Sequence, residues 1–329
     1  MPATSPLPLK IAIATYGHTA ALKDGRVPIE RVKADFVEVT PIIAAFRRMV
    51  REVEFDVCEM APATYMIARS FGAPFKALPV FIMRRFHHGG FVYRPDAGMR
   101  APKDLEGKKA GVRAYSVSTG IWTRGILQNE YGVDLSKVTW VVDDEEHVRE
   151  LKLPPNVVHA PEGKSLVSMI AAGEIQAAHT GPAGIGRAGA PKTNWEAGVA
   201  AKPQEYPELF PDAPRLEAEW YRKTGIYPTH GLIVVKDKVL AEHPWVARAL
   251  FDAFLAAKQL YVDRLKAAQV ENDTDRNYRE LSSTVGDPLP YGVKENRPAI
   301  EALIKYCYQQ RLLPKHYAID EMFVDPKAG

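Results

Sequence analysis

The stretch FKALPVFIMRRFHHGG (residues 75–90) joins a continuous apolar run to a polar cluster and two glycines. The run FKALPVFI (75–82) has the length and composition of a buried strand. A strand that only reaches the surface needs one polar residue, but four follow here: Arg84, Arg85, His87 and His88. We interpret the segment as a crossover, in which a strand leaves one core and begins to line a cleft.

Strand-like and helix-like segments alternate on both sides of this crossover. Before it, we expect strands at 9–16, 32–40 and 55–61 and helices at 41–52 and 62–72. After it, we expect strands at 108–114, 138–144, 176–181 and 230–236 and helices at 116–132, 165–175, 243–266 and 295–311. Residues 186–215 are rich in Gly, Ala and Pro and are expected to be irregular. Strands separated by helices predict parallel sheets and an α/β fold.

The alternating segments form two blocks, near residues 9–84 and 108–181, and so predict two α/β lobes. We place lobe I at 1–98 plus 232–329 and lobe II at 99–231, so that lobe I is discontinuous in sequence. Ligands of such folds lie at the carboxyl ends of strands and in the cleft between lobes.

Composition excludes several classes of protein. The 329 residues carry 43 basic and 40 acidic side chains, a net charge of +3 that argues against a nucleic-acid partner. Two cysteines without a CxxC motif favour neither a disulfide framework nor a structural zinc site. No apolar stretch is long enough to span a membrane, and the first residues do not resemble a secretory signal, so we expect a cytoplasmic protein.

Seven collinear motifs resemble the 4,5-dihydroxyphthalate decarboxylase family. They are DGRV (24–27), EFDVCEM (54–60), PVFIMRRFHH (79–88), APKDLEGKKAGVRAYSVSTGIWTRGILQNEYGV (101–133), WYRKTGIYP (220–228), HPWVARALFDAF (243–254) and PYGVKENR (290–297). The resemblance covers most of the chain. It implies a two-lobed fold of the periplasmic-binding-protein type II kind, with a ligand cleft between the lobes.

The resemblance also implies an activity, the conversion of 4,5-dihydroxyphthalate to protocatechuate and CO₂ without a cofactor. Direct loss of CO₂ would leave an unstable aryl carbanion. The accessible route protonates the ring carbon that carries the carboxylate, with electron release from a para hydroxyl. Such a site needs a general acid, an acceptor for the phenol proton and cations for a dianionic substrate.

Arginine guanidinium groups bind carboxylates through paired hydrogen bonds. Arg84 and Arg124 lie in motifs that carry the resemblance, so we expect them to bind substrate. The alternatives are a solvated strand end for Arg84 and an exposed helix charge for Arg124. Because strand residues alternate between faces, we expect Arg84 and His88 to face the ligand. Arg85 and His87 are then expected to face away from it.

The start of the helix expected at 116–132 is a candidate anion site. Free backbone N–H groups and the helix dipole favour a carboxylate there. The side chains at this position can add donors: Tyr115, Ser116, Ser118 and Thr119. Ordinary capping of the helix is the alternative, and one serine would satisfy it.

Histidine titrates near neutrality and therefore suits proton transfer to carbon. Our candidates are His88, His179 and His230, which lie at expected strand ends or crossovers. For His179 a buried, hydrogen-bonded role is the alternative. His230 stands one residue before the position at which the resembling family carries a histidine. We expect the following to be loop or helix-surface residues: His18, His147, His159, His243 and His316.

Two further residues at expected strand ends complete the candidate site. Glu59 ends the strand at 55–61 and can accept a phenol proton or orient a histidine, the alternative being a salt bridge to an arginine. Tyr16 ends the first strand and can stack on or hydrogen-bond the ring, the alternative being an ordinary edge tyrosine.

We expect no metal and no cofactor. His87 and His88 are adjacent, so on a strand they point apart, and DDEEH (143–147) is better interpreted as a solvated loop or a helix start. The GxG spacing in GPAGIGRAGA (181–190) lacks the strand, helix and acidic residue of a dinucleotide site.

Two other functions stay open: a solute-binding protein for an aromatic carboxylate, and a family member acting on another hydroxybenzoate. In each case the partner is a small aromatic carboxylate. The amphipathic tail helix is compatible with a homo-oligomer.

Overall fold

The computed structural model describes residues 5–186 and 205–327, so residues 187–204 of the segment expected to be irregular lie outside the described part. The chain forms two compact units. Unit 1 contains Met1–Arg85, Thr229–Glu301 and Tyr317–Gly329, and unit 2 contains Phe86–Pro228 and Ala302–His316. The first division falls inside the polar cluster at residues 84–88. Residues 302–316, which we expected in lobe I, group with unit 2.

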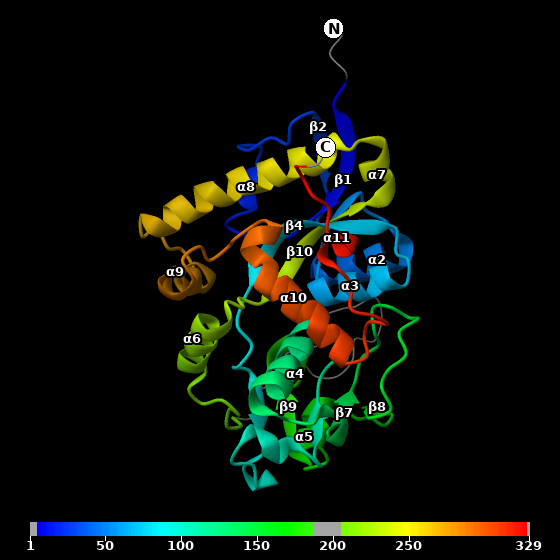
Figure 1. Ribbon diagram of the computed structural model, residues 1–329, viewed down its shortest axis with the longest axis vertical. Coiled ribbons are helices and arrows are strands. Elements are labelled where there is room, and N and C mark those ends of the chain that lie inside the picture. The colour runs from blue at the N-terminus through cyan, green and yellow to red at the C-terminus, as the bar shows by residue number, and fades with distance from the viewer. Residues whose placement is uncertain (1–4, 187–204, 328–329) are drawn as a thin grey trace. The chain divides into compact units, whose positions relative to one another are not determined.

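Unit 1 is built on a five-stranded sheet in the order β2-β1-β3-β10-β4 (Figure 1). Its strands are β1 (Leu7–Ala12), β2 (Val32–Phe36), β3 (Val57–Met60), β4 (Phe75–Arg84) and β10 (Thr229–Lys236). β1 pairs in parallel with β2 and β3, but β10 runs antiparallel to β3 and β4. The expectation of a purely parallel sheet is therefore wrong for β10. The chain enters β10 from unit 2 and not through a helical crossover on this sheet, so nothing imposes a parallel direction.

Unit 1 also contains the following helices. They are α1 (Ala20–Lys23), α2 (Ile43–Glu52), α3 (Pro62–Ser70), α7 (Asp237–Glu242), α8 (Trp245–Lys266), α9 (Asp273–Val285), α11 (Ile319–Met322) and α10 (Val293–Gln309), which continues past the division at residue 301. α8 is the long helix beside the sheet in Figure 1. It buries Val246, Leu250 and Phe254, spaced by one helical turn, against strand residues such as Ile11 and Ile82.

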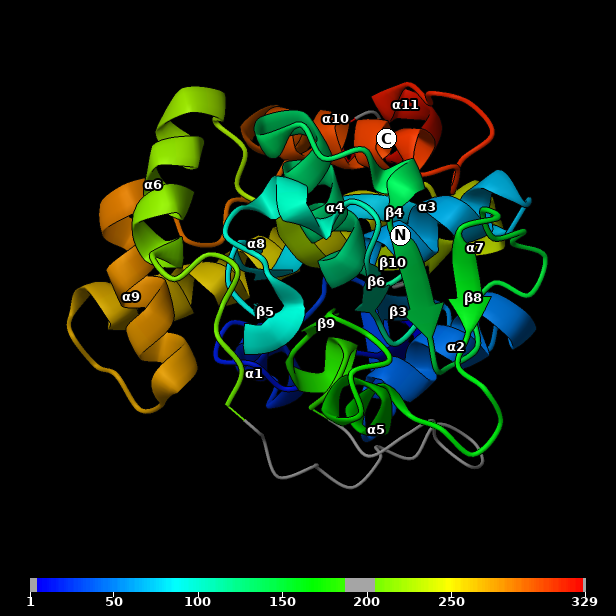
Figure 2. The ribbon, with the colours of Figure 1, turned by 90° about the horizontal axis from the view of Figure 1, so that it is seen from below.

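Unit 2 contains a second five-stranded sheet in the order β5-β9-β6-β7-β8. Its strands are β5 (Phe91–Tyr93), β6 (Lys109–Gly111), β7 (Thr139–Val142), β8 (Val157–His159) and β9 (Ala177–His179). All neighbours are parallel except β5, which is antiparallel to β9. Helix α5 (Leu166–Ala171) lies beside β9 and packs Leu166 and Ile170 on Val141 and Ala178 (Figure 2).

The other long helices of unit 2 are α4 (Ser118–Tyr131) and α6 (Ala213–Thr224), and single 3₁₀ turns occur at Pro95–Ala97, Pro102–Leu105, Leu135–Lys137 and Gly181–Ala183. Helix α4 ends at the boundary expected from sequence, where Gly132 has φ +64°, a conformation that glycine adopts without strain. Capping by a serine, the alternative to an anion site, is not observed: Val117 is the N-cap residue and no side chain caps α4. No helix in the described part of the chain is long and apolar enough to cross a membrane.

Candidate functional site

Unit 1 has a pocket of about 640 Å³ where β1 and β4 end, a volume typical of a small-molecule site. The loop after β1 contributes Tyr16 and His18, and the end of β4 contributes Arg84 and Arg85. Residues from α8, α9 and the loop between them close it. The complete lining is Thr15, Tyr16, Gly17, His18, Ile82, Met83, Arg84, Arg85, Tyr261, Asn272, Asp273, Thr274, Asp275, Asn277 and Tyr278.

Glu59, on β3, lies directly behind Tyr16. The Tyr16 hydroxyl donates to Glu59 Oε1 at 2.7 Å, and the Ala14 N–H donates to Oε2 at 3.0 Å. The Glu59 side chain is only 1% exposed, and this burial raises its pKa to about 7 although both hydrogen bonds favour the ionised form. Burial and the neighbouring carboxylate raise the pKa of Tyr16, so its hydroxyl keeps its proton. Glu59 therefore changes charge near neutral pH, as a proton-transfer group must.

The loop that carries Tyr16 is fixed by Thr19. The Thr19 hydroxyl accepts from the Tyr16 N–H at 2.8 Å and donates to the Ala14 carbonyl oxygen at 2.8 Å. Because both bonds are short and Thr19 is buried, the tyrosine is held in place by the backbone as well as by Glu59.

His18 was expected at the surface, and that expectation is wrong. The ring is 2% exposed, and its Nε2 atom lies 2.7 Å from the Ile82 carbonyl oxygen. It stacks on Tyr16 with 5.4 Å between centroids and 5° between planes. Burial lowers the pKa of His18 to about 4, so the imidazole is neutral at pH 7. His147, also expected at the surface, is buried in unit 2.

Both arginines at the end of β4 line the pocket, although we expected only Arg84 to face a ligand. Arg84 is buried, and its guanidinium donates to Asn296 Oδ1 and, at 3.4 Å, to the Pro290 carbonyl oxygen. Arg85 is exposed, lines the pocket and donates to His230 Nε2 at 3.0 Å. The alternation of faces ends here because β4 itself ends at Arg84. Partial burial and the Arg85 charge lower the pKa of His230, whose ring is therefore neutral.

In unit 2, Arg124 is fully buried; the Glu146 charge acts on it, but no carboxylate in the described part of the chain forms an ion pair with it. Its Nε donates to Gln310 Oε1 at 2.7 Å, and Nη2 donates to the Tyr115 carbonyl oxygen. The guanidinium also lies 3.8 Å from the centre of the Tyr115 ring and 5.1 Å from that of Trp140. Nη1 has no hydrogen-bond partner among the residues that the structure describes. A buried cation with a spare donor is equipped to take an anion.

The helix start that we expected to bind an anion holds a carboxylate of the chain itself. Glu146 accepts from the Tyr115 N–H at 2.6 Å, from the Ser116 N–H at 3.1 Å and from the Ser116 hydroxyl. Ser118 is buried and Thr119 is half-buried in the first turn of α4. Nothing in the sequence motif DDEEH had marked Glu146 for this position, because the contact joins residues about thirty positions apart.

The remaining histidine candidates lie in other surroundings within unit 2. His88 packs against Phe210 and Trp220, and its Nδ1 lies 3.9 Å from the Glu217 carboxylate. Burial nevertheless lowers the pKa of His88 to about 4, so the contact is not an ion pair at neutral pH. His179, fully buried on β9, has the Phe91 ring edge-on at 4.8 Å.

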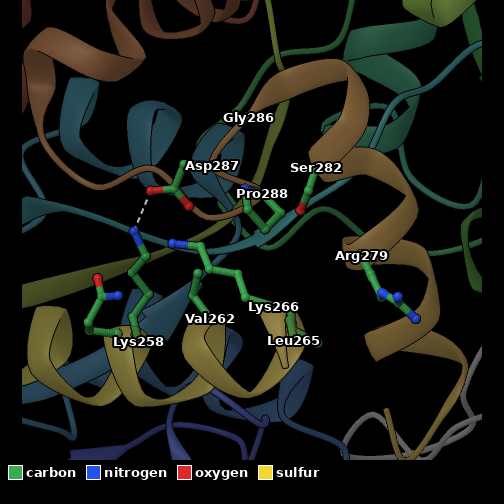
Figure 3. A pocket seen from close by; sticks show the side chains of 10 residues that line it. Lys258, Val262, Leu265, Lys266, Arg279, Ser282, Gly286, Asp287 and Pro288 are labelled. Carbon is green, nitrogen blue, oxygen red and sulfur yellow. Dashed lines mark hydrogen bonds and ion pairs between the residues drawn. The ribbon is translucent and has the colours of Figure 1, made fainter. Parts of the chain in front are cut away.

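A second, smaller pocket of about 310 Å³ lies between α8 and the α9 region of unit 1 (Figure 3). Lys258 forms an ion pair with Asp287 on its wall, and the other cations, Lys266 and Arg279, are exposed. Its lining has no histidine, tyrosine or glutamate to move a proton. Across residues 5–186 and 205–327, no three His, Cys, Asp or Glu side chains are grouped as a metal site would require.

The fold defines the class of protein. The chain is similar to the alkanesulfonate-binding protein SsuA from Xanthomonas axonopodis pv. citri, at 14% identity and a TM-score of 0.50, over 98% of this chain and 99% of that one. It is also similar to the periplasmic aliphatic sulphonate-binding protein SsuA from Escherichia coli, at 10% identity and a TM-score of 0.51, over 99% and 94%. A family model described as NMT1/THI5 like matches residues 45–152. The expected fold of the periplasmic-binding-protein type II kind is confirmed.

Sequence relatives define the family within this class. A 4,5-dihydroxyphthalate decarboxylase of Comamonas testosteroni is 30% identical over 97% of this chain and 97% of its own length. Another of that name, from Pseudomonas putida, is 35% identical over 52% of this chain and 69% of its own. The chain belongs to the 4,5-dihydroxyphthalate decarboxylase family, which confirms the resemblance of its motifs.

Proposed function

We propose that this protein decarboxylates a dihydroxylated aromatic dicarboxylate, converting 4,5-dihydroxyphthalate to protocatechuate and CO₂ without a cofactor. The observation that carries the proposal is the Tyr16–Glu59 pair: a buried carboxyl whose pKa lies near 7, joined by a hydrogen bond to a tyrosine on the wall of an aromatic pocket. The names of the two relatives support the same reaction.

The reaction begins as a tautomerisation. The hydroxyl para to the departing carboxylate loses its proton toward Tyr16 Oη, and Glu59 takes a proton from Tyr16 in the same relay. A proton from solvent, relayed by one of the candidate histidines, adds to the ring carbon that bears the carboxylate, so the ring becomes a dienone. The carbon–carboxylate bond then breaks, CO₂ leaves, and the electron pair restores the aromatic ring as a phenolate. Glu59 returns its proton through Tyr16, so one proton from solvent replaces one CO₂.

Cationic and hydroxyl groups bind the two carboxylates in this proposal. In unit 1 the candidates are Arg84, as expected from sequence, and Arg85, and both line the pocket. In unit 2 they are Arg124, with its spare Nη1, and the hydroxyl and N–H groups of Tyr115, Ser116, Ser118 and Thr119. Binding at Tyr115 and Ser116 requires that Glu146 give up its hydrogen bonds there.

In this proposal the candidate histidines take part in proton transfer. His88 and His230 are neutral at pH 7 because burial lowers their pKa values. A neutral ring accepts a proton more readily than it donates one, so we assign them, with His179, to accepting or relaying protons. Glu59 takes up the phenol proton through Tyr16 and later returns it, so a histidine has to relay the proton that adds to the ring carbon.

Turnover of 4,5-dihydroxyphthalate tests the proposal directly. Full-length protein, treated with a chelator, should release CO₂ and protocatechuate from this substrate. Absence of product from folded protein would overturn the proposal. Activity that disappears on chelation and returns with a metal would overturn its cofactor-free chemistry.

A solute-binding function is the second candidate, favoured by the fold shared with the two SsuA proteins. It predicts tight binding of the aromatic acid with no release of CO₂. Another hydroxybenzoate as substrate is the third candidate, and the same assay with 4-hydroxybenzoate and 2,4-dihydroxybenzoate separates it from the first.

A further inference from the structure

His18 is the pocket residue for which the sequence suggested no role. Its Nε2 atom lies 2.7 Å from the Ile82 carbonyl oxygen, and a carbonyl oxygen can only accept. Nε2 therefore carries the hydrogen. Because the ring is neutral at pH 7, its other nitrogen, Nδ1, has a lone pair and no hydrogen.

The Nδ1 atom is the unbonded ring nitrogen of a residue that lines the pocket. It has no hydrogen-bond partner in the described part of the chain, and protein atoms do not enclose it completely. His18 itself is part of the pocket lining. An acceptor in this position has to be satisfied by solvent or by a donor on the ligand.

Aromatic neighbours hold the imidazole in this orientation. Tyr16 is stacked in parallel at 5.4 Å, Tyr261 lies tilted at 5.6 Å and Tyr278 lies edge-on at 6.5 Å, measured between ring centroids. Tyr261 is itself tied to Asp275 Oδ1 by a 2.5 Å hydrogen bond. Gly17 permits this packing, because a Cβ there would come within 2.2 Å of the Tyr261 ring. The ring cannot turn to offer a hydrogen in place of the lone pair.

Building on the proposed function, we infer that His18 determines substrate specificity by accepting a hydrogen bond from a ring hydroxyl through Nδ1. Its lone pair attracts a phenol O–H and repels carboxylate or sulfonate oxygens, which offer only lone pairs. The unit 1 pocket therefore selects hydroxylated aromatic acids over aromatic acids and sulfonates of the same shape. Sites that satisfy a substrate hydroxyl with a buried group discriminate strongly against analogues that lack it.

Binding measurements with ligands that do not turn over test this role. The probes are 3,4-dihydroxybenzoate, benzoate and benzenesulfonate, titrated into the full chain by calorimetry. Wild-type protein should prefer the dihydroxy acid over each of the other two by about tenfold or more, the equivalent of one hydrogen bond of about 1.4 kcal/mol. Equal affinities, or no binding of any probe, would overturn the inference.

Two variants separate the contribution of the Nδ1 acceptor from that of the Nε2 donor. In His18→Gln the amide nitrogen can replace Nε2 as donor to Ile82, but nothing replaces the Nδ1 acceptor. Its preference for the dihydroxy acid should fall at least tenfold, with benzoate affinity unchanged. His18→Asn places an oxygen near the Nδ1 position and should recover part of the preference. An unaltered preference in His18→Gln would overturn the inference, and exposed His159→Gln is the matched control.

The outcomes separate this inference from the proposed reaction. Selective binding without CO₂ release would retain the role of His18 and remove the decarboxylase proposal. CO₂ release with no preference for hydroxylated probes would retain the decarboxylase proposal and remove the role of His18. Melting temperature, followed for each variant, shows whether a lost preference reflects a lost fold.

Discussion

The Tyr16 hydroxyl lies 2.7 Å from Glu59 Oε1 and is the polar group that connects this buried carboxyl to the pocket of unit 1. Glu59 is on β3, which lies beside β1 in the sheet, and Tyr16 follows β1 in the chain. The pair thus arises from two adjacent strands that end on the same side of a parallel pair, the position at which α/β folds place their ligands.

Tyr16→Phe should stop proton transfer between the pocket and Glu59. We expect kcat to fall by about 10²–10⁴, the usual contribution of a positioned acid–base group. The hydrogen bond from Tyr16 lowers the pKa of Glu59, so its loss should move the apparent pKa of turnover upward. A pH–rate profile measures both effects. Tyr93→Phe, in unit 2, is the control, and full activity in Tyr16→Phe would exclude the relay.

Glu59→Gln should change how the stability of the protein depends on pH. Burial raises the pKa of Glu59 to about 7, above its unfolded value of about 4.3, so the folded state holds an extra proton between these values. This contribution to stability is complete below the unfolded pKa and is lost as pH rises through the folded pKa. Glutamine does not titrate, so the Glu59→Gln variant does not lose this contribution to stability as pH rises.

Urea unfolding at pH 5 and pH 8 measures this difference. Relative to wild type, Glu59→Gln should gain on the order of 3 kcal/mol between the two conditions, from about 1.4 kcal/mol per pH unit. His18 and other titrating groups occur in both proteins and cancel from the comparison. Parallel stability curves would show that Glu59 does not titrate in this window.

The strands and helices before the crossover could be predicted because their signals are local. The run expected as a strand at 75–82 is β4 (Phe75–Arg84), and the helix expected at 62–72 is α3 (Pro62–Ser70), which begins at a proline. Helices α6 and α9 were missed because each buries few side chains, only Trp220 in α6 and Asp275 and Tyr278 in α9. Their sequences are mostly polar, so they differ only weakly in composition from a loop. Terminal signals were present in both: Asn272 caps α9 by accepting from the Asp275 N–H, and Gly225 ends α6 in the left-handed conformation.

The residues of the candidate site also fall into two groups: those marked by local sequence and those whose surroundings form only in the folded chain. Tyr16 and Glu59 could be proposed because each follows or ends a strand, a property of the local sequence. His18 could not, because its burial and fixed ring depend on Ile82, Tyr261 and Tyr278, which approach it only in the folded chain.

Glu146→Ala should destabilise the protein, because it leaves the buried Tyr115 N–H and the Ser116 groups without their acceptor. Each lost acceptor for a buried donor costs about 1–3 kcal/mol, so the free energy of unfolding should fall by at least this amount. Glu146→Gln keeps one acceptor oxygen, so its free energy of unfolding should lie between those of wild type and Glu146→Ala. Exposed Glu150→Ala is the control, and equal stability of both alanine variants would show that the Glu146 contacts contribute nothing.

Arg124→Lys should weaken substrate binding more than it slows catalysis. Lysine keeps the charge but cannot contact Gln310 and the Tyr115 carbonyl together while offering a further N–H, as the guanidinium does. Loss of one charge-assisted hydrogen bond, about 1.5–3 kcal/mol, should raise KM about 10–150-fold with a smaller change in kcat. Exposed Arg222→Lys, also in unit 2, is the matched control. If both variants keep the wild-type KM and melting temperature, Arg124 does not bind the substrate carboxylate.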